Sequence, residues 1–361
     1  MTVLPLTSQF YTEKIQIRKD TFRAKVYKEH MQFLTLTPNE LFSSCKQMGR
    51  ISLTDDGILC DWSAAGFSVN ITASLAVVDF APYRADQPVY IAVYVDGVKQ
   101  IHALGGDCCR VVVPMTSGTH TLTVLRLSEG MVPLYCTGLR LATADTEGAP
   151  ALLPPPANNA RRVVFFGDSI TCGFGNTGET TSPYLTSEQD PTEAYAWRCA
   201  ALLGADAELV SISGQGIVRD CGGNTGIPIP TFFGWQSRHL RTAHVYPDDA
   251  DIVVINAGTN DCGGRVTNEE FYDGAKAFLH DLRAHYPRAK LVWCYGLMGL
   301  YYDGVLRALE TELAGTDAAF TYLPVSPIAW ERGEVGAVGH PSVEGDVRGA
   351  AELAAALYRM V

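Results

Sequence analysis

Residues 163–176 read VVFFGDSITCGFGN, and this stretch decides the class of fold. An uninterrupted apolar run ends at Gly167, and the polar residues Asp168 and Ser169 follow at once. A short continuous apolar run is typical of a strand that is buried on both faces, as in a parallel sheet. Ser169 therefore either belongs to a turn that caps a helix or is a nucleophile held at the end of a sheet.

The remainder of the second half repeats this pattern. Four more short apolar runs follow, AELVSIS, ADIVVINAG, AKLVWCYG and FTYLPVS, which begin at residues 207, 250, 289 and 320. Helical stretches alternate with them, and one has a capping box in which Thr267 precedes Glu270 by three residues. This alternation predicts an α/β fold, a parallel five-stranded sheet of the flavodoxin-like kind with helices on both faces. Ligands of such sheets bind at the carboxyl ends of the strands.

The first part of the chain has a different pattern. Residues 20–143 contain many short β-like runs, and no amphipathic period of helical length appears among them. Asp96-Gly97 and Ser117-Gly118 each lie between two such runs, which predicts two hairpins. We therefore expect an all-β domain over residues 1–143, a β-sandwich or jelly roll.

The two patterns meet in TADTEGAPALLPPPANNARR, residues 143–162. The consecutive prolines Pro154, Pro155 and Pro156 exclude a helix there and stiffen the chain. This composition predicts a Pro-rich linker over residues 144–160 and places the α/β domain at residues 161–361.

The charge balance restricts the partners. The 361 residues include 28 Lys+Arg and 39 Asp+Glu, a formal net charge of −11. An acidic chain without a basic cluster is a poor candidate for binding nucleic acid or an anionic membrane. Neutral sugars or small esters fit better, and formation of a homo-oligomer stays open. No cysteine pair has CxxC spacing and no residues have metal-ligand spacing, so we expect reduced thiols and neither metal nor cofactor.

The N-terminal sequence MTVLPLTSQFYTEKIQIRKD lacks the basic-then-apolar pattern of a signal peptide. No apolar run is long enough to span a bilayer. We therefore expect a cytoplasmic protein, on the understanding that a removed signal peptide would leave the same pattern.

Residues suited to ester hydrolysis follow the predicted strands in order. Ser169 follows the first strand, Gly214 the second and Asn260 the third, and His340 in GHPS precedes the last helix. A serine attacks an ester carbonyl when a base such as histidine takes its proton. The backbone N–H groups of Ser169 and Gly214 and the Asn260 amide would form an oxyanion hole. Each motif alone is common, and the ordered set indicates a hydrolase.

These blocks resemble the SGNH hydrolases, also called the GDSL family. GDSIT carries Ser169, GTND carries Asn260 and GHPS carries His340, and Gly214 matches the second block. The N-terminal β domain, the linker, SISGQGIVRD and HPSVEGD resemble carbohydrate esterase family two, the acetylxylan esterases with an N-terminal jelly roll. This resemblance implies deacetylation of plant polysaccharides or xylo-oligosaccharides by serine and histidine without a metal.

One position departs from that family pattern. Most of the superfamily has Asp three residues before the histidine, where this chain has Ala337. A carboxylate there normally sets the tautomer of the imidazole. Either a main-chain carbonyl near Ala337 or an acid such as Glu334 must therefore orient His340. The resemblance favours the carbonyl, because some members of the family are described as Ser–His dyads.

Other residues near the blocks have supporting roles. We interpret Asp168 as structural, because a side chain next to the nucleophile tends to point away from it; a catalytic acid is the alternative. Asp261 holds its loop or contacts the substrate. Sugars dock on aromatic faces, so Trp330 and Trp235 are candidates for substrate binding, the latter in IPIPTFFGWQSRH, a loop expected to form a lid or rim.

Alternative functions remain at this point. The same machinery would serve another acyl substrate, as in a lipase or acyl esterase. The chain would also suit a non-enzymatic carbohydrate-binding protein, since fold alone does not guarantee function. Acetate release from acetylated xylo-oligosaccharides separates these alternatives.

Overall fold

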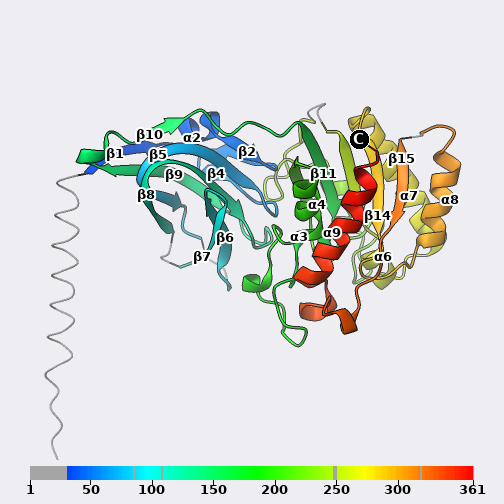
Figure 1. Cartoon of the computed structure of the whole chain (residues 1–361). Helices are drawn as coiled ribbons and strands as arrows, with labels where there is room; N and C mark the ends of the chain where they lie inside the picture. Colours follow the sequence, from blue (N-terminus) through cyan, green and yellow to red (C-terminus); the bar gives the residue numbers. More distant parts are fainter. Residues whose placement is uncertain (1–30, 84–85, 107–108, 247–249, 318, 361) are drawn as a thin grey trace, which may run out of the picture.

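The computed structural model describes residues 31–83, 86–106, 109–246, 250–317 and 319–360. Figure 1 shows a curled β domain beside an α/β domain, joined by a strap along one side of the molecule. Within the described ranges, no helix combines the length and apolarity needed to cross a bilayer.

The second half forms the predicted parallel sheet. Its strands are β11 (Arg161–Gly167), β12 (Ala205–Ser211), β13 (Ile252–Asn256), β14 (Lys290–Tyr295) and β15 (Phe320–Pro324). Among the described residues these five strands pair in parallel in the order β12-β11-β13-β14-β15. The first predicted strand therefore lies inside the sheet, which explains why VVFFG is apolar at every position.

Helices cover both faces of this sheet, as predicted (Figure 1). The longer ones are α4 (Tyr195–Leu202), α7 (Asn268–His285), α8 (Asp303–Leu313) and α9 (Val343–Leu357). Val163 and Phe165 pack with α4 and α9, whereas Val164 and Phe166 point to the face covered by α7 and α8. Thr267 and Glu270 form the predicted capping box of α7. The shorter helices are α3 (Ser169–Cys172), α5 (Ile229–Phe232), α6 (Thr259–Gly263), η1 (Asp145–Glu147), η2 (Thr186–Glu188), η3 (Trp330–Arg332) and η4 (Ala337–Gly339).

The β domain is a curled antiparallel sheet of jelly-roll type. Its strands are β1 (Met31–Leu36), β2 (Lys46–Met48), β3 (Ser52–Thr54), β4 (Gly57–Leu59), β5 (Gly66–Phe80), β6 (Val89–Val95), β7 (Val98–Leu104), β8 (Arg110–Arg126), β9 (Tyr135–Ala144) and β10 (Ala151–Leu153). The main path runs β3-β4-β9-β5-β8-β6-β7; β1 pairs with β9, and β2 and β10 pair with β5. A short helix, α2 (Pro38–Ser44), was not predicted because its seven residues are too few to show a helical period.

One predicted hairpin is confirmed and the other is wrong. Asp96 and Gly97 have φ of 51° and 82° and connect β6 to β7, as a tight hairpin turn requires. Ser117 and Gly118 instead lie within the 17-residue strand β8. The neighbouring strand β5 is almost as long and pairs along most of it, with a register shift between Ala73 and Leu75 that absorbs the irregularity.

The predicted linker is attached to both domains. Ala151–Leu153 form β10 and pair with β5, so part of the stretch 144–160 extends the β sheet. The Pro154 carbonyl accepts from the Asn70 side chain, and the Ala157 carbonyl accepts from Lys46. Lys46 also pairs with Asp206 on β12 at 2.6 Å. This stretch therefore crosses between the domains along a held path.

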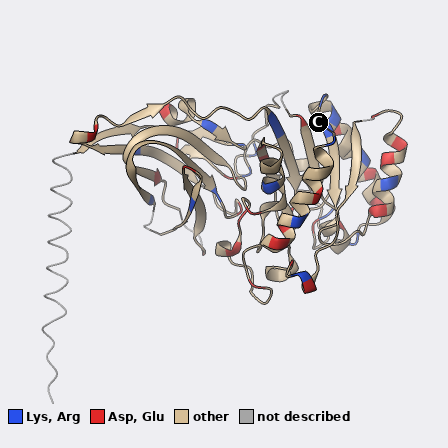
Figure 2. Cartoon of the chain, in the orientation of Figure 1, with Lys and Arg blue, Asp and Glu red and all other residues tan. Residues whose placement is uncertain are grey.

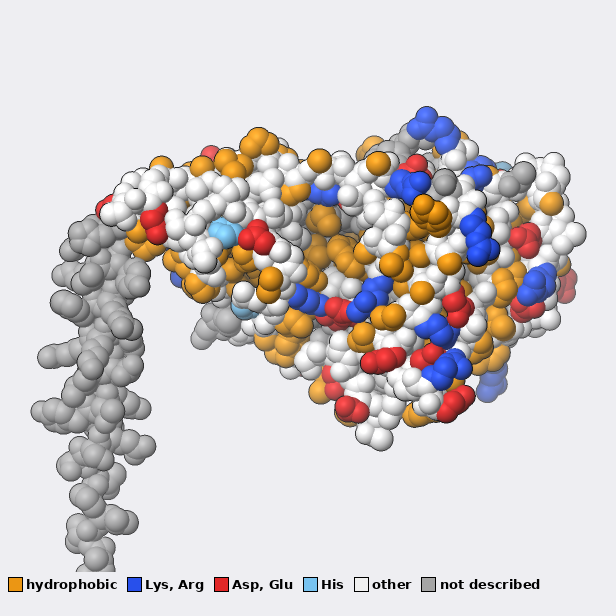
Figure 3. Space-filling view, viewed as in Figure 1, with side chains coloured by type: hydrophobic (Ala, Val, Ile, Leu, Met, Phe, Trp, Pro, Cys, Tyr) orange, Lys and Arg blue, Asp and Glu red, His pale blue; other side chains and the backbone are white. Residues whose placement is uncertain are grey.

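A common core joins the two domains. The loop that contains Phe232, Phe233 and Trp235 lies between them, and its buried aromatic rings belong to the same hydrophobic cluster as Trp62 of the β domain. Buried Arg50 of the β domain pairs with Glu208 on β12 at 2.6 Å. On the face drawn in Figure 3, hydrophobic side chains gather in the hollow where the domains meet.

The cysteines among the described residues are free thiols, in line with the absence of CxxC spacing. Five of these nine thiols are buried, Cys45, Cys109 and Cys262 are partly exposed, and Cys221 is exposed. Cys108 lies outside the described residues.

Candidate active site

The structure places Ser169 directly after β11, as the first residue of α3. Asp168 caps this helix, and its Oδ1 accepts from the Ile170 N–H at 3.0 Å. This cap turns Asp168 inward, as its structural interpretation requires. The Ser169 Oγ lies 2.9 Å from Nε2 of His340, although the two residues are 171 positions apart. This is the contact a serine nucleophile needs with its base.

His340 sits in a tight loop ahead of α9. The Gly336 N–H donates to the His340 carbonyl at 2.7 Å, and the Ala337 N–H donates to the Gly175 carbonyl at 2.9 Å. The second bond ties the histidine loop to the loop that follows the nucleophile. A parallel sheet brings both loops to the same edge, because they follow the carboxyl ends of its strands.

Among the described residues, no carboxylate contacts the second ring nitrogen of His340, and Nδ1 is buried without a hydrogen-bond partner. The carbonyls of Val338 and Ala337 lie near the ring. Burial lowers the pKa of His340 below its usual value, and these two carbonyls offset part of that shift. The imidazole is therefore kept neutral and able to accept a proton.

Aromatic side chains and a strained backbone residue surround the His340 imidazole. Val338 has φ 54° and ψ 29°, a left-handed conformation that is rare for a β-branched residue. The ring of Phe174 lies 4.6 Å from that of His340, centroid to centroid, and Tyr184 stacks on Phe174 at 3.8 Å. The imidazole therefore packs against an aromatic face, next to a loop with an unusual backbone conformation.

Glu334 does not orient His340. Its carboxylate accepts from Arg332 at 2.7 Å, from Arg348 at 2.8 Å and from the Ala329 N–H at 3.0 Å. Hydrogen bonds from Arg332, followed by those from Arg348 and the Ala329 N–H, lower the pKa of Glu334 to about 2. Both oxygens are committed to this cluster, so Glu334 is not available to orient His340, and orientation by a main-chain carbonyl stays a prediction.

Main-chain donors for an oxyanion lie beside Ser169. Gly214 follows β12, the neighbour of β11, and has φ +80°, a conformation that a side chain would strain. Its carbonyl accepts from the Cys221 N–H at 2.9 Å. In the described part of the chain, the N–H groups of Ser169 and Gly214 have no acceptor, so both can bind a developing oxyanion.

Asn260 joins the loops that follow β11, β12 and β13. Its Nδ2 donates to Asp168 Oδ2 at 2.9 Å and to the Gln215 carbonyl at 3.0 Å. Both amide hydrogens are therefore in use in this structure. Asn260 can serve as an oxyanion donor only by exchanging one of these bonds, a condition that the sequence did not reveal.

Asp261 holds the loop after β12 and does not face the substrate. It is buried, and its carboxylate accepts from the N–H groups of Ile217 at 2.8 Å and Val218 at 2.7 Å. Of the two roles considered for Asp261, these bonds support the loop role and not substrate binding. Burial raises the pKa of Asp168 to about 7, and the charge of Asp261 adds to this shift although the Ile170 N–H opposes it.

The structure separates the two candidate tryptophans. Trp330 is 67% exposed and lines a groove of about 260 Å³ with Gly339, the residue before His340. Trp235 instead packs between the domains: its carbonyl accepts from Arg50, and the Arg241 guanidinium lies 4.9 Å above its ring. The proposed lid or rim around Trp235 is therefore part of the domain interface, because its aromatic rings complete the common core.

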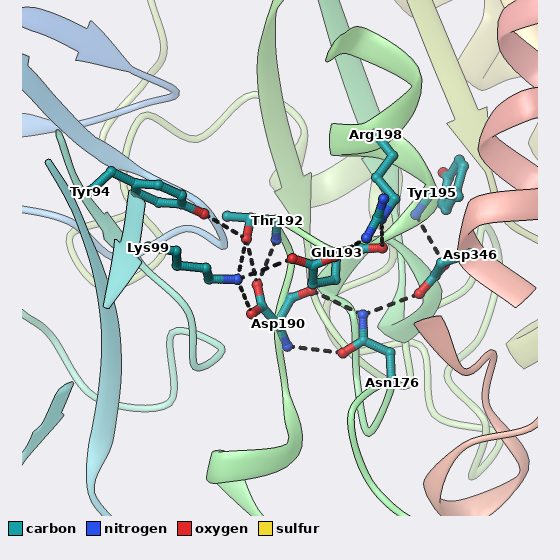
Figure 4. A network of polar contacts seen from close by, with 9 residues as sticks. All are labelled: Tyr94, Lys99, Asn176, Asp190, Thr192, Glu193, Tyr195, Arg198 and Asp346. Atoms are coloured by element: carbon teal, nitrogen blue, oxygen red, sulfur yellow. Dashed lines mark hydrogen bonds and ion pairs between the residues drawn. The ribbon is translucent and has the colours of Figure 1, made fainter. Parts of the chain in front are cut away.

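A polar network connects the β domain to the loops behind the site (Figure 4). Lys99 of β7 pairs with Asp190, whose N–H and carbonyl both bond to the side chain of Asn176 at 3.0 Å. Asn176 also donates to Asp346 of α9 at 3.1 Å, and Asp346 accepts from the Tyr195 N–H. Burial raises the pKa of Asp346 to about 8. The network fixes the nucleophile loop against the helix that follows His340.

Sequence reasoning missed the residues that support this site from a distance. Phe174 lies in the quoted GDSITCGFGN stretch but carried no visible signal, and Tyr184 and Asn176 depend on contacts that only the folded chain makes. In the described ranges no cluster of His, Cys, Asp and Glu side chains has the arrangement of a metal site.

Comparison with known proteins agrees with this geometry. Residues 165–345 match the model of the GDSL-like lipase/acylhydrolase family. The chain is 26% identical over 273 residues to the cellulase/esterase CelE of Acetivibrio thermocellus, covering 73% of this chain and 32% of that protein. It is 26% identical over 190 residues to an acetylxylan esterase/glucomannan deacetylase of Cellvibrio japonicus, half of each chain. The chain thus spans about a third of the length of the first relative and about half of the length of the second.

Solved structures share the whole fold. A family two carbohydrate esterase from Clostridium thermocellum superposes with a TM-score of 0.74 at 22% identity, covering 87% of this chain and 98% of that one. An acetyl xylan esterase from the rumen bacterium Butyrivibrio proteoclasticus gives a TM-score of 0.80 at 18% identity, covering 91% and 98%. With the matched residues spanning the Ser169, Gly214, Asn260 and His340 blocks, the chain belongs to the GDSL-like lipase/acylhydrolase family.

Proposed function

We propose that this protein is a carbohydrate O-acetyl esterase that removes acetyl groups from xylan or xylo-oligosaccharides. The observation that carries the proposal is the 2.9 Å contact of Ser169 Oγ with His340 Nε2, next to two main-chain N–H groups that have no acceptor among the described residues. The names of the relatives support the substrate class, since two of them are acetylxylan esterases or deacetylases.

In the proposed reaction, Ser169 Oγ attacks the acetyl carbonyl carbon while His340 Nε2 takes its proton. The N–H groups of Ser169 and Gly214 stabilise the oxyanion. Collapse of this intermediate expels the sugar hydroxyl, which receives the proton from His340. Water, deprotonated by His340, then attacks the acetyl-serine, and acetate leaves as Ser169 regains its proton.

The surroundings of the site suit a neutral sugar. Trp330 offers an exposed indole face in a groove that it shares with Gly339, the residue before His340, and apolar pyranose faces pack against such rings. In Figure 2, acidic residues outnumber basic ones along α8 and α9. Trp330 is therefore our proposed platform for the sugar.

Acetate release from acetylated xylo-oligosaccharides tests the proposal, with the Ser169→Ala variant as the control for contaminating esterase. We expect release by the wild type and only trace activity from the variant, whose fold is checked by its melting temperature. An acyl esterase of another kind is the second candidate, because Leu297, Met298 and Ile328 give the groove an apolar lining. Faster hydrolysis of octanoate than acetate esters, without release from the sugar, would establish that candidate instead.

A further inference from the structure

A loop of the β domain reaches the active site from outside the α/β domain. This loop follows β8, and the buried Arg126 guanidinium holds it by donating to the carbonyls of Ser128 at 2.7 Å and Glu129 at 2.9 Å. A Cβ at Gly130 would lie 2.0 Å from the Asp61 carbonyl oxygen, so only glycine allows this close approach. The position of Glu129 is therefore set by the packing of the β domain.

The Glu129 carboxylate contacts the strand-to-loop segment that presents Gly214. It is 4% exposed, and its Oε1 accepts from the Ser213 N–H at 3.1 Å and from Arg238 at 2.6 Å. Ser213 immediately precedes Gly214. Gln215 immediately follows Gly214, and its carbonyl accepts from Asn260. Glu129 and Asn260 therefore bind the residues on either side of Gly214.

The same residue also connects to the histidine side of the site. The Glu129 N–H donates to Gln189 Oε1 at 2.9 Å, and the Tyr184 hydroxyl donates to the same oxygen at 2.6 Å. Tyr184 stacks on Phe174, whose ring faces His340. One residue of the β domain thus braces both the Gly214 loop and the aromatic support of the imidazole.

We propose that Glu129 is a positioning residue for the esterase reaction, which makes the β domain a structural part of the oxyanion hole. The inference rests on the proposed function of Ser169 and His340. An oxyanion donor acts only if it points at the place where charge develops. By holding the Ser213 N–H, Glu129 fixes the peptide unit immediately before the one that carries the Gly214 N–H, and so restrains the position of that donor.

The test compares full-length Glu129→Ala and Glu129→Gln with a matched control, Glu208→Gln. Glu208 is also a buried carboxylate paired with an arginine across the domain interface, but it pairs with Val164 within the sheet, before the end of β12. The measurements are kcat and KM on p-nitrophenyl acetate, the affinity of a trifluoromethyl ketone that forms an oxyanion on Ser169, and the melting temperature.

Glu129→Ala should lower kcat about ten- to a hundredfold, below the loss for deleting an oxyanion donor itself, with little change in KM. Affinity for the ketone should fall by a similar factor. Glu129→Gln should recover most of kcat, because the amide oxygen still accepts from the Ser213 N–H. Glu208→Gln should lower the melting temperature and leave kcat within about threefold of wild type.

An unchanged kcat in Glu129→Ala would overturn the inference. An equal loss of kcat in Glu208→Gln would also overturn it, because the effect would then come from docking of the two domains in general. Glu129→Gln as impaired as Glu129→Ala would also overturn it, since the charge opposite Arg238 would then be what matters. If Glu129→Ala does not fold, Glu129→Asp carries the same prediction, because its shorter side chain withdraws from Ser213. A wild type without Ser169-dependent hydrolysis would instead refute the proposed function.

Discussion

Asn260→Ala removes an amide that the structure shows in two roles. Its Nδ2 donates to Asp168 and to the Gln215 carbonyl, at 2.9 and 3.0 Å. Losing an oxyanion donor costs about 2.7–4 kcal/mol of transition-state stabilisation. Because one existing hydrogen bond, worth about 0.5–1.5 kcal/mol, must be given up for the oxyanion, the net contribution is about 1.2–3.5 kcal/mol. We therefore expect kcat to fall about eight- to four-hundredfold.

The same variant should be less stable. The Gln215 carbonyl loses a buried donor, at a cost of about 1–3 kcal/mol. Asp168 loses one as well, but with a pKa of about 7 it can take up a proton instead of remaining an unpaired anion. For a domain of this size, each kcal/mol corresponds to about 2–4 °C in Tm. Thermal denaturation should therefore show a loss of several degrees.

Steady-state kinetics on p-nitrophenyl acetate, with Tm measured on the same samples, checks both effects. Asn260→Asp is the matched variant, because it keeps the shape of the side chain but loses the N–H donor and places a second carboxyl beside Asp168. Both variants should lose kcat with KM nearly unchanged. A fall in Tm with unchanged kcat would refute the oxyanion role and leave Asn260 as a purely structural link. A mainly KM effect would make it a ground-state ligand.

Other predictions address the histidine and its surroundings. Since burial lowers the pKa of His340, the acidic limb of kcat/KM should lie below the usual imidazole value, and a limb above pH 7 would indicate an unseen carboxylate partner. Glu334→Gln should lower Tm but keep kcat within about threefold, because Arg332 and Arg348 hold that carboxylate away from the ring; a thousandfold loss would restore it as the third catalytic member. Ala337→Asp should destabilise the fold without creating a triad, because the Ala337 side chain is buried against neighbouring glycines; full stability with a raised acidic limb would contradict this. Incubation with EDTA should leave hydrolysis unchanged, and activity restored by added zinc would show that a metal takes part.

Between pH 7 and 8 the protein should lose stability as pH rises. Burial raises the pKa of Asp346 to about 8, so in this interval the folded state binds a proton that the unfolded state, with an ordinary carboxyl pKa, does not. Stability present at lower pH is then lost as pH rises through the folded-state pKa. Thermal denaturation across this range measures the slope, and a rising Tm would contradict the assignment.

Local patterns in the sequence determined the elements of the α/β domain and the order of its chemical blocks. Apolar runs such as VVFFG form strands because only strands buried on both faces tolerate that composition. The capping box of α7 and the Asp96-Gly97 turn were equally readable, since each depends on a few adjacent residues. The hairpin predicted at Ser117-Gly118 is wrong, because pairing with the long strand β5 outweighs the local preference of these two residues for a turn.

Tertiary structure alone decided how those blocks are held. The surroundings of His340 are an example. Val338 and Phe174 lie next to the ring, and two arginines hold Glu334 in another cluster. None of these contacts follows from spacing along the chain. Trp235 and Trp330 are both aromatic candidates in sequence, yet Trp235 packs in the domain interface, whereas Trp330 is exposed in a groove that it shares with Gly339. Contacts between residues far apart in sequence, such as Glu129 with Ser213, leave no periodic or local signal, because their geometry exists only after both domains have folded and docked.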